Sequence, residues 1–336
     1  MARCEHEEND VGKIRILDEV LSNQIAAGEV VERPASVVKE LIENAIDAGA
    51  NAVTVDIAGG GVTRIRVVDN GCGMSDTDLM LSIDRHATSK VARIEDLDNI
   101  QTLGFRGEAL PSIASVGKLC IRTRAQGMPA ASFMRIVGGE KHPLEQVAGP
   151  VGTDVLLEDL FYNVPARRKF LKKAQTESSH VVDVVQRMAL SSPHVGFRMV
   201  KDERVLFDLP AVTRLEDRAL GLFGEKRMQG VRSLTRAGAF GLDGLLGSPD
   251  ALTGTSRHYY LYINGRFVRD RVLMSAVQAG YGPRLAKGKH PFVLLRLRVP
   301  PQFVDVNVHP AKTEVRFVDT RAVHRLVSSA VDQTLS

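Results

Sequence analysis

Residues 34–48 read PASVVKELIENAIDA, and a glycine follows at position 49. Proline is favoured in the first turn of a helix and glycine just after its end, so this stretch predicts one helix. The apolar side chains fill one half of the helix surface. Glu40, Asn44 and Asp47 fall within an arc of about 60° on the other side. The helix therefore presents two carboxylates and an amide beside its apolar, core-facing surface.

The next stretch predicts an antiparallel hairpin followed by a glycine loop. Residues 53–57 and 64–68 alternate apolar and polar side chains, and Gly59–Gly61 joins them. Asp69 follows directly and begins an Asp-x-Gly-x-Gly loop that ends at Gly73. A carboxylate at a strand end can accept a hydrogen bond from the exocyclic amine of adenine, and the glycines let the backbone approach a ligand closely. Taken alone, this loop is equally typical of a strand-to-helix turn.

The polar side of the predicted helix suggests phosphate chemistry. A carboxylate such as Glu40, placed beside a phosphate, can orient a water and accept its proton. Asn44, one turn further on, can offer its amide oxygen to Mg²⁺, which prefers oxygen ligands and keeps several waters. By itself, however, a Glu-x-x-x-Asn spacing is more typical of a solvated helix face.

Residues 88–108 are rich in loop signals and predict a lid over the same site. The backbone N–H groups of Gly104, Phe105, Arg106 and Gly107, at the start of a helix, would cradle phosphate oxygens. Such a long loop suits a segment that becomes ordered around a nucleotide. Plain turn chemistry remains the alternative. The chain has no G-x-x-x-x-G-K-[ST] motif, which argues against a P-loop enzyme.

The amino-acid composition indicates the cellular compartment of the protein and the kind of partner that it binds. Three cysteines without C-x-x-C spacing argue against a disulfide framework or a structural zinc site, and no apolar run is long enough to span a membrane. We therefore expect a cytoplasmic protein. Residues 1–210 carry 25 basic and 30 acidic side chains, whereas residues 211–336 carry 19 and 10. This excess predicts a polyanionic partner for the second half, unless the charges are dispersed over a solvated surface.

The pattern of elements predicts an α+β fold with helices over one face of a sheet. We expect residues 1–13 to be disordered, an ATP-binding domain over residues 14–213 and a second domain over residues 214–336. Further strands are expected at residues 118–124, 132–137, 152–158, 259–263, 292–299 and 315–318. Further helices are expected from Ser75 toward His86, at residues 176–190 and 271–280, and from Thr320 onward.

Longer strings around these motifs resemble the N-terminal region of the MutL family of DNA mismatch repair proteins. That family belongs to the ATPase superfamily shared with type II topoisomerases, heat-shock chaperones and histidine kinases. The similarity covers roughly residues 14–335. The matching strings are NQIAAGEVVERP (23–34), KELIEN (39–44), DAGA (47–50), RHATSK (85–90), GFRGEAL (104–110), LFYNVPARRKF (160–170), NGR (264–266) and VDVNVHPAK (304–312).

The resemblance implies a fold and a set of roles. It implies an ATPase α/β sandwich followed by a domain similar to ribosomal protein S5 domain 2, with ATP and Mg²⁺ as cofactors. ATP would lie against the open face of the sheet under the lid. By resemblance, Glu40 would be the general base and Lys312 would reach the γ-phosphate. Asn44 would hold Mg²⁺. The remaining ATP-binding residues would be Asp47, Asp69, Gly73, Thr88, Ser89, Gly104, Phe105, Arg106, Gly107 and Thr153.

The resemblance also implies a function and partners. ATP binding and slow hydrolysis would drive homodimerisation of the N-terminal domains and close a clamp on double- or single-stranded DNA. Arg266, Arg269 and Arg271 would contact the DNA phosphates. The expected protein partners are the mismatch-recognition protein MutS and a downstream nuclease or helicase. The expected location is the bacterial cytoplasm, associated with the nucleoid.

Two other functions remain open at this stage. A topoisomerase-type ATPase subunit would share the nucleotide motifs, but it would need strand-cleaving tyrosine chemistry elsewhere. The second alternative is a clamp that binds ATP and recruits repair factors without depending on hydrolysis. MutL proteins also carry a C-terminal dimerisation domain, in some members a metal-dependent endonuclease, and the 336 residues neither assign nor deny that activity.

Overall fold

The structure, a computed structural model, describes residues 27–28, 30–85, 87, 107–305 and 315–336. The expected disordered segment, residues 1–13, lies outside the described residues. So do six of the expected site residues: Thr88, Ser89, Gly104, Phe105, Arg106 and Lys312.

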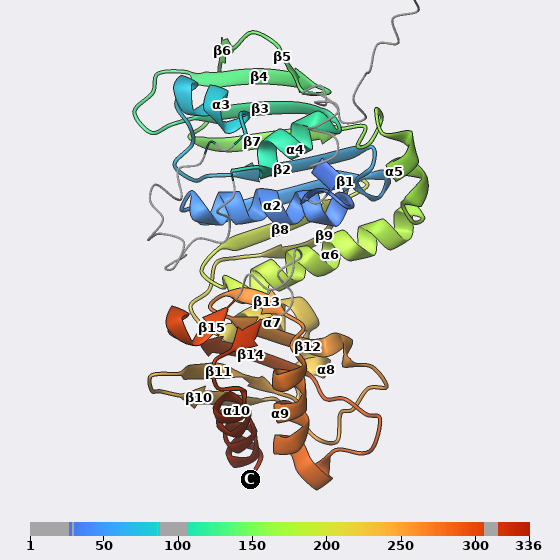
Figure 1. Ribbon diagram of the computed structural model, residues 1–336, viewed down its shortest axis with the longest axis vertical. Helices are drawn as coiled ribbons and strands as arrows, with labels where there is room; N and C mark the ends of the chain where they lie inside the picture. The colour runs from blue at the N-terminus through green and yellow to red at the C-terminus, as the bar shows by residue number, and fades with distance from the viewer. Residues whose placement is uncertain (1–26, 29, 86, 88–106, 306–314) are drawn as a thin grey trace, which may run out of the picture.

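Within the described residues, the first part of the chain forms a nine-stranded mixed sheet (Figure 1). The only parallel pair in this sheet is β1 with β8; its other neighbouring strands are antiparallel. The strand order is β5 (Glu140–Lys141), β4 (Ala131–Val137), β3 (Lys118–Arg124), β7 (Gly152–Glu158), β2 (Arg64–Asp69), β1 (Ala52–Ala58), β8 (Gly196–Lys201) and β9 (Arg204–Leu209), and β6 (Glu145–Val147) pairs with β4.

Helices cover one face of this sheet (Figure 1). They are α2 (Pro34–Asp47), α3 (Asp76–Ser82), α4 (Ala109–Ser115), α5 (Pro165–Phe170) and α6 (Ala174–Ser191). The central helix α2 contacts β1, β2, α4 and α6. Its apolar side, which includes Val38 and Ile42, is fully buried with Val55 and Ile65 of the strands beneath it. Burial of this one side leaves the side with Glu40 and Asn44 only half-buried.

The second part of the chain forms a smaller sheet that is covered on both faces. Its strand order is β10 (Arg232–Arg236), β11 (Gly241–Leu246), β14 (Val293–Arg298), β12 (Tyr259–Ile263) and β13 (Arg266–Val268). Helices α9 (Arg271–Tyr281) and α10 (Thr320–Leu335) pack on one face. The other face packs on α7 (Leu215–Phe223) and on Leu190 of α6. The remaining short elements are α8 (Glu225–Met228), β15 (Val304–Asp305), β16 (Arg316–Phe317) and the 3-10 turns η1 (Gly59–Gly61), η3 (Ser256–His258), η4 (Gly282–Arg284) and η5 (Pro301–Phe303).

The two sheets are joined through α6. The hydroxyl of Tyr262 in β12 donates a hydrogen bond to the carbonyl of Arg187 at 2.9 Å. The guanidinium of Arg187 lies 3.9 Å from the ring centroid of Phe267 in β13, a cation–π contact. The end of α6 therefore contributes to the packing of both parts of the chain.

The α+β fold and most of its elements are as expected. The helix at residues 34–48, the hairpin that follows it and the Ser75 cap, whose hydroxyl accepts a hydrogen bond from the N–H of Asp78, are confirmed. The helix after Ser75 ends at Ser82, before the expected end at His86. The elements that no local pattern predicted include β5, β6, β10, β11, β13, α5, α7 and α8. The boundary at residues 213 and 214 stays a prediction. No helix among the described residues has the length and apolar composition needed to cross a lipid bilayer.

Among the described residues, Arg218 of α7 is the largest fully buried side chain, and it links α7 to the end of the first part of the chain. It is 1% exposed, and its Nη2 donates to the carbonyls of Pro193, Val195 and Pro210 at 2.8, 2.6 and 2.9 Å. These carbonyls belong to the loop after α6 and to the residue after β9. We expect Arg218→Met to lower the free energy of unfolding by about 2–3 kcal/mol, because buried carbonyls lose a charged donor. Urea unfolding followed by circular dichroism measures it.

The matched control is Arg214→Met, because the Arg214 side chain is 69% exposed. An equal loss of stability in the two variants would contradict the role given to the Arg218 guanidinium.

Candidate functional site

The polar side of α2 carries a carboxylate pair held around one ammonium. Lys39 Nζ lies 3.1 Å from Glu40 Oε1 and 2.9 Å from Glu43 Oε1, and Glu43 is only 6% exposed. Burial by itself lowers the pKa of Lys39, but the charges and hydrogen bonds of Glu43 and Glu40 outweigh it, so the pKa is raised. Lys39 therefore stays charged and fixes one oxygen of Glu40.

The Asp69 loop is fixed against the C-terminal end of this helix. The N–H of Cys72 donates to the carbonyl of Ala48, the C-cap of α2, at 2.9 Å. On the other side of the loop, the side-chain oxygen of Asn70 accepts hydrogen bonds from the N–H groups of Asn51 and Ala52, both at 3.0 Å. These contacts bring the loop to the end of α2 that carries Asn44 and Asp47.

Asp69 is half-buried at the end of β2. Its carboxylate accepts a hydrogen bond from the N–H of Gly71 at 2.8 Å, and the N–H of Thr153 also stabilises its charged form. Burial raises the pKa of Asp69, and the two N–H groups only partly offset this effect. The Asp69 carboxyl group is therefore partly desolvated, and its oxygens are suited to accept a hydrogen bond from an amino group.

Thr153 of β7 lies directly opposite Asp69 in the antiparallel pair of β2 and β7. Two glycines permit the close approach of the chains here. A Cβ on Gly73, whose φ is +68°, would lie 2.0 Å from the carbonyl oxygen of Arg124. A Cβ on Gly152, whose φ is +117°, would lie 2.2 Å from the carbonyl oxygen of Asp69. Any larger residue at either position would push the Asp69 loop away from β3 or β7.

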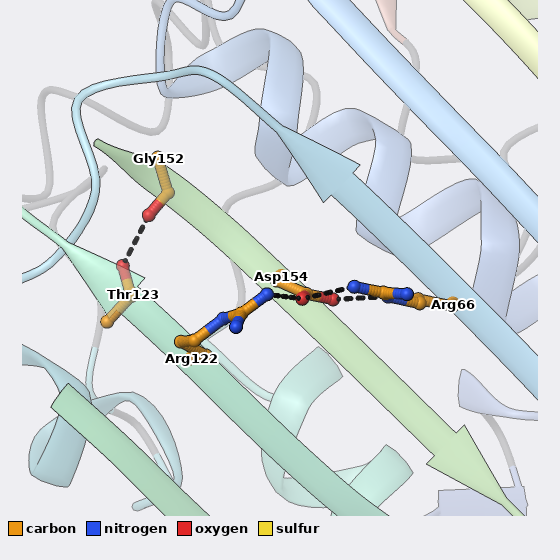
Figure 2. A network of polar contacts seen from close by, with 5 residues as sticks. All are labelled: Arg66, Arg122, Thr123, Gly152 and Asp154. Atoms are coloured by element: carbon orange, nitrogen blue, oxygen red, sulfur yellow. Dashed lines mark hydrogen bonds and ion pairs between the residues drawn. The ribbon is translucent and has the colours of Figure 1, made fainter. Parts of the chain in front are cut away.

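The opposite face of the sheet carries a different group of side chains. Asp154, the neighbour of Thr153, points to that face and lies between Arg66 and Arg122, with contacts of 2.8 and 2.6 Å (Figure 2). Burial raises the pKa of Asp154, but the two guanidinium groups outweigh it, and the pKa is lowered. A shallow cavity of about 610 Å³ lies over these residues.

This arrangement corrects one expectation. Asp69 and Thr153 share the face of Val67 and Val155, both buried in the core with α2. Successive residues of a strand point to opposite faces. The two residues expected to contact adenine therefore lie on the helix-covered face, and not on the open face of the sheet, where ATP was expected.

Asn44 is the residue that could hold a magnesium ion together with phosphates and waters. Among the described residues, no group of three acidic, histidine or cysteine side chains is arranged to hold a metal ion. Asn44 is half-buried on α2, next to the carboxylates of Glu40 and Glu43. A single amide oxygen suits Mg²⁺ when phosphates and waters supply the other ligands.

The three expected DNA-contacting arginines have different surroundings. Arg269 and Arg271 are exposed at the start of α9. Arg266 is half-buried; burial lowers its pKa, and the charges of Glu43, Asp47 and Glu40 oppose this effect. Arg266 therefore lies within electrostatic range of α2, whereas Arg269 and Arg271 face solvent.

Two residues of the site were not anticipated. Lys39 lies four residues before Glu43, a spacing that marks an ion pair on a helix and could have identified it. Thr123 of β3 contacts Thr153, with 3.0 Å between their hydroxyl oxygens. No local pattern identifies Thr123, because this contact depends on strand register. Gly107, the one described residue of the expected phosphate loop, has a φ of +61° and lies two residues before α4.

Two family models match the chain. A histidine kinase-, DNA gyrase B- and HSP90-like ATPase model matches residues 32–148, which include α2, Asp69 and Gly107. A model of the C-terminal domain of DNA mismatch repair proteins matches residues 220–336. The two matches cover most of the nine-stranded sheet and the whole of the smaller one.

Bacterial relatives are similar along almost the whole chain. The DNA mismatch repair protein MutL of Geobacter sulfurreducens is 47% identical over 96% of this chain and 53% of its own length. That of Heliobacterium modesticaldum is 46% identical over 97% of this chain and 50% of its own length. The chain thus spans about half the length of the curated relatives it matches.

Solved structures give the same result. The Aquifex aeolicus MutL ATPase domain complexed with ADP is 28% identical, with a TM-score of 0.62 over 89% of this chain and 98% of that one. The ATP-binding domain of topoisomerase IV from Francisella tularensis, 13% identical with a TM-score of 0.55 over 94% of this chain and 90% of that one, shares the fold alone. The chain belongs to the MutL family of DNA mismatch repair proteins and corresponds to its N-terminal ATPase region.

Proposed function

We propose that this chain binds ATP with Mg²⁺ and hydrolyses it slowly, between the C-terminal half of α2 and the Asp69 loop. The observation that carries the proposal is the 2.9 Å hydrogen bond from Cys72 to Ala48, which holds the Asp69 loop at the end of the helix. It supports the proposal because it holds the loop of Asp69, the proposed contact for the base, at the end of the helix that also carries Asn44. The ADP complex of the Aquifex aeolicus relative supports the same class of ligand.

Each residue has a role that suits its surroundings. Asp69 accepts a hydrogen bond from the exocyclic amine of adenine, with Gly73 and Thr153 beside it. Asn44, together with the phosphates, would hold Mg²⁺, which when bound would supply positive charge to the phosphates. Asp47, Gly107 and the expected residues 88, 89, 104–106 and 312 complete the contacts with ATP.

Glu40 acts as the general base. Lys39 holds its Oε1 at 3.1 Å, so Oε2 is the oxygen that accepts the proton of the attacking water.

We further propose that ATP binding dimerises the N-terminal regions and closes a clamp on DNA. The second part of the chain has 19 basic and 10 acidic side chains in residues 211–336, which favours contact with phosphates. In this proposal the clamp couples mismatch recognition by MutS to a downstream nuclease or helicase. ATP binding would hold the clamp closed and hydrolysis would release it.

Topoisomerase-type strand cleavage is a weaker alternative. It requires an accessible tyrosine hydroxyl as the nucleophile. Four of the five tyrosines in this chain are at most 5% exposed, and burial raises the pKa of each. Tyr162 is 37% exposed and lies over Lys118. These surroundings favour tyrosines with a structural role.

The general base can be tested by Glu40→Ala. We expect the rate of ATP hydrolysis to fall by about 100-fold or more, because the proton acceptor is lost, with the affinity for ATP retained. Steady-state release of phosphate, with and without DNA, and calorimetric titration measure the two quantities.

The control is Glu32→Ala, an exposed carboxylate just before α2. Hydrolysis near the wild-type rate in Glu40→Ala would show that another group accepts the proton.

The burial of Asp69 predicts a pH dependence of stability. Its pKa in the folded state is raised above 3.8, so the folded protein binds more protons and loses stability as pH rises from 3.8 through the raised pKa. Asp69→Asn lacks this proton. Its free energy of unfolding, relative to wild type, should therefore rise with pH over that window and then level off.

The same variant should bind ATP at least about tenfold more weakly, because an amide replaces a charged acceptor. Chemical denaturation across the pH series, with Glu32→Gln as the control, measures the stability effect. A difference between wild type and Asp69→Asn that does not change with pH would refute the burial argument.

DNA binding can be tested by the double variant Arg269→Glu, Arg271→Glu. We expect weaker binding of double-stranded DNA, and the slope of log K against log salt should become shallower by about 2, because about 0.9 counterion is released per phosphate contact. Fluorescence anisotropy over a salt series measures this slope.

The control pair, Lys201→Glu with Arg204→Glu, lies at the β8–β9 hairpin of the acidic first part. An equal effect of the two pairs would indicate a response to total charge and not a binding face.

A further inference from the structure

Three polar side chains lie in a row across adjacent strands of the large sheet. Asp69 of β2 lies opposite Thr153 of β7, and Thr153 lies opposite Thr123 of β3. Directly opposite residues of neighbouring strands point to the same face, so all three face the helices. Thr123 is 1% exposed, whereas Thr153 and Asp69 are half-buried. The row therefore runs from a buried hydroxyl to the site proposed for adenine.

The hydrogen bonds of Thr123 determine the direction in which its hydroxyl proton points. Its Oγ1 lies 3.0 Å from the carbonyl oxygen of Gly152, which can only accept, so the Thr123 proton goes there (Figure 2). The N–H of Met74, which can only donate, donates a hydrogen bond to the same Oγ1 at 2.9 Å. A hydroxyl has one proton and two lone pairs. Thr123 thus has one lone pair left, and no proton.

The third contact of Thr123 is with the hydroxyl of Thr153, at 3.0 Å. Because the Thr123 hydroxyl already donates its hydrogen bond to Gly152, the proton between the two hydroxyls must belong to Thr153. The Thr153 oxygen is then left with lone pairs alone on its exposed side. Any ligand group that meets this oxygen must donate a proton to it.

We propose that Thr123 is a positioning residue that makes Thr153 a hydrogen-bond acceptor only, so that the site takes a purine with a 6-amino group and rejects one with a 6-keto group. This inference rests on the proposed nucleotide site. Asp69 and Thr153 present two adjacent acceptors. A 6-amino group donates to them, whereas a 6-keto oxygen meets acceptors and stays unpaired. Leaving buried polar groups unpaired gives strong discrimination between ligands.

The test compares the affinities of the whole chain for ADP and IDP, which differ at the 6 position and are not hydrolysed by an ATPase. Thr123→Val keeps the shape but removes the hydroxyl, so the Thr153 proton is freed to turn toward the ligand. We expect the ratio of the ADP and IDP affinities, measured by calorimetry, to fall by about tenfold. The ratio is the readout because general damage to the fold weakens both nucleotides together.

Two further variants separate positioning from structure. Thr123→Ser restores the hydroxyl and should restore the wild-type ratio. In a Thr153→Val background the ratio should no longer respond to Thr123→Val, because the oxygen that Thr123 directs is absent. An unchanged ratio in Thr123→Val, in a chain that still prefers ADP, would overturn the inference. Failure of the wild-type chain to bind either diphosphate would instead refute the proposed nucleotide site.

A measurement on the wild-type chain covers the case in which Thr123→Val does not fold. Neutron diffraction from crystals of the perdeuterated chain locates the deuterons of both hydroxyls. The inference requires the Thr153 deuteron between the two threonine oxygens and the Thr123 deuteron toward Gly152. A Thr153 deuteron directed into the open site would overturn it.

Discussion

The register of β2 against β7, in which Asp69 lies opposite Thr153, is the constraint on which the site depends. A slip of one residue would turn every side chain of β2 to the other face. Asp69 would then join Asp154 on the open side, and Arg66 would enter the apolar core. The register is set by the same alternation that buries Ile65 and Val67. The packing of the core and the positions of the candidate site residues are thus determined together.

A second constraint is the attachment of the smaller sheet to α6. The contacts of Arg187 with Tyr262 and Phe267 fix β12 and β13 beside the first domain. Arg266, the residue before Phe267, then lies in the field of the α2 carboxylates. The two parts of the chain therefore share one electrostatic environment around the helix that carries Glu40. Arg269 and Arg271, which follow Arg266 in the sequence, are exposed.

Local patterns predicted the elements whose signals lie within a few residues. The helix at residues 34–48 has proline at its start, glycine after its end and a clear apolar side, and it forms as expected. Strands β3, β7 and β12 form at the expected bounds because their side chains alternate or are uniformly apolar. Strand β11 reads GLDGLL, which resembles a loop. It becomes a strand because β10 and β14 pair on its two sides.

The same division holds for the candidate site. The sequence by itself determined which residues are candidates for the chemistry, because Glu40 and Asn44 share a helix side through helical periodicity, and Asp69 ends a strand. Only the tertiary structure decided which face of the sheet the site occupies and that Thr123 directs the proton of Thr153. It also separated Arg266 from Arg269 and Arg271. These features depend on the pairing of strands distant in sequence, and such pairing is set by packing of the whole core rather than by any local pattern.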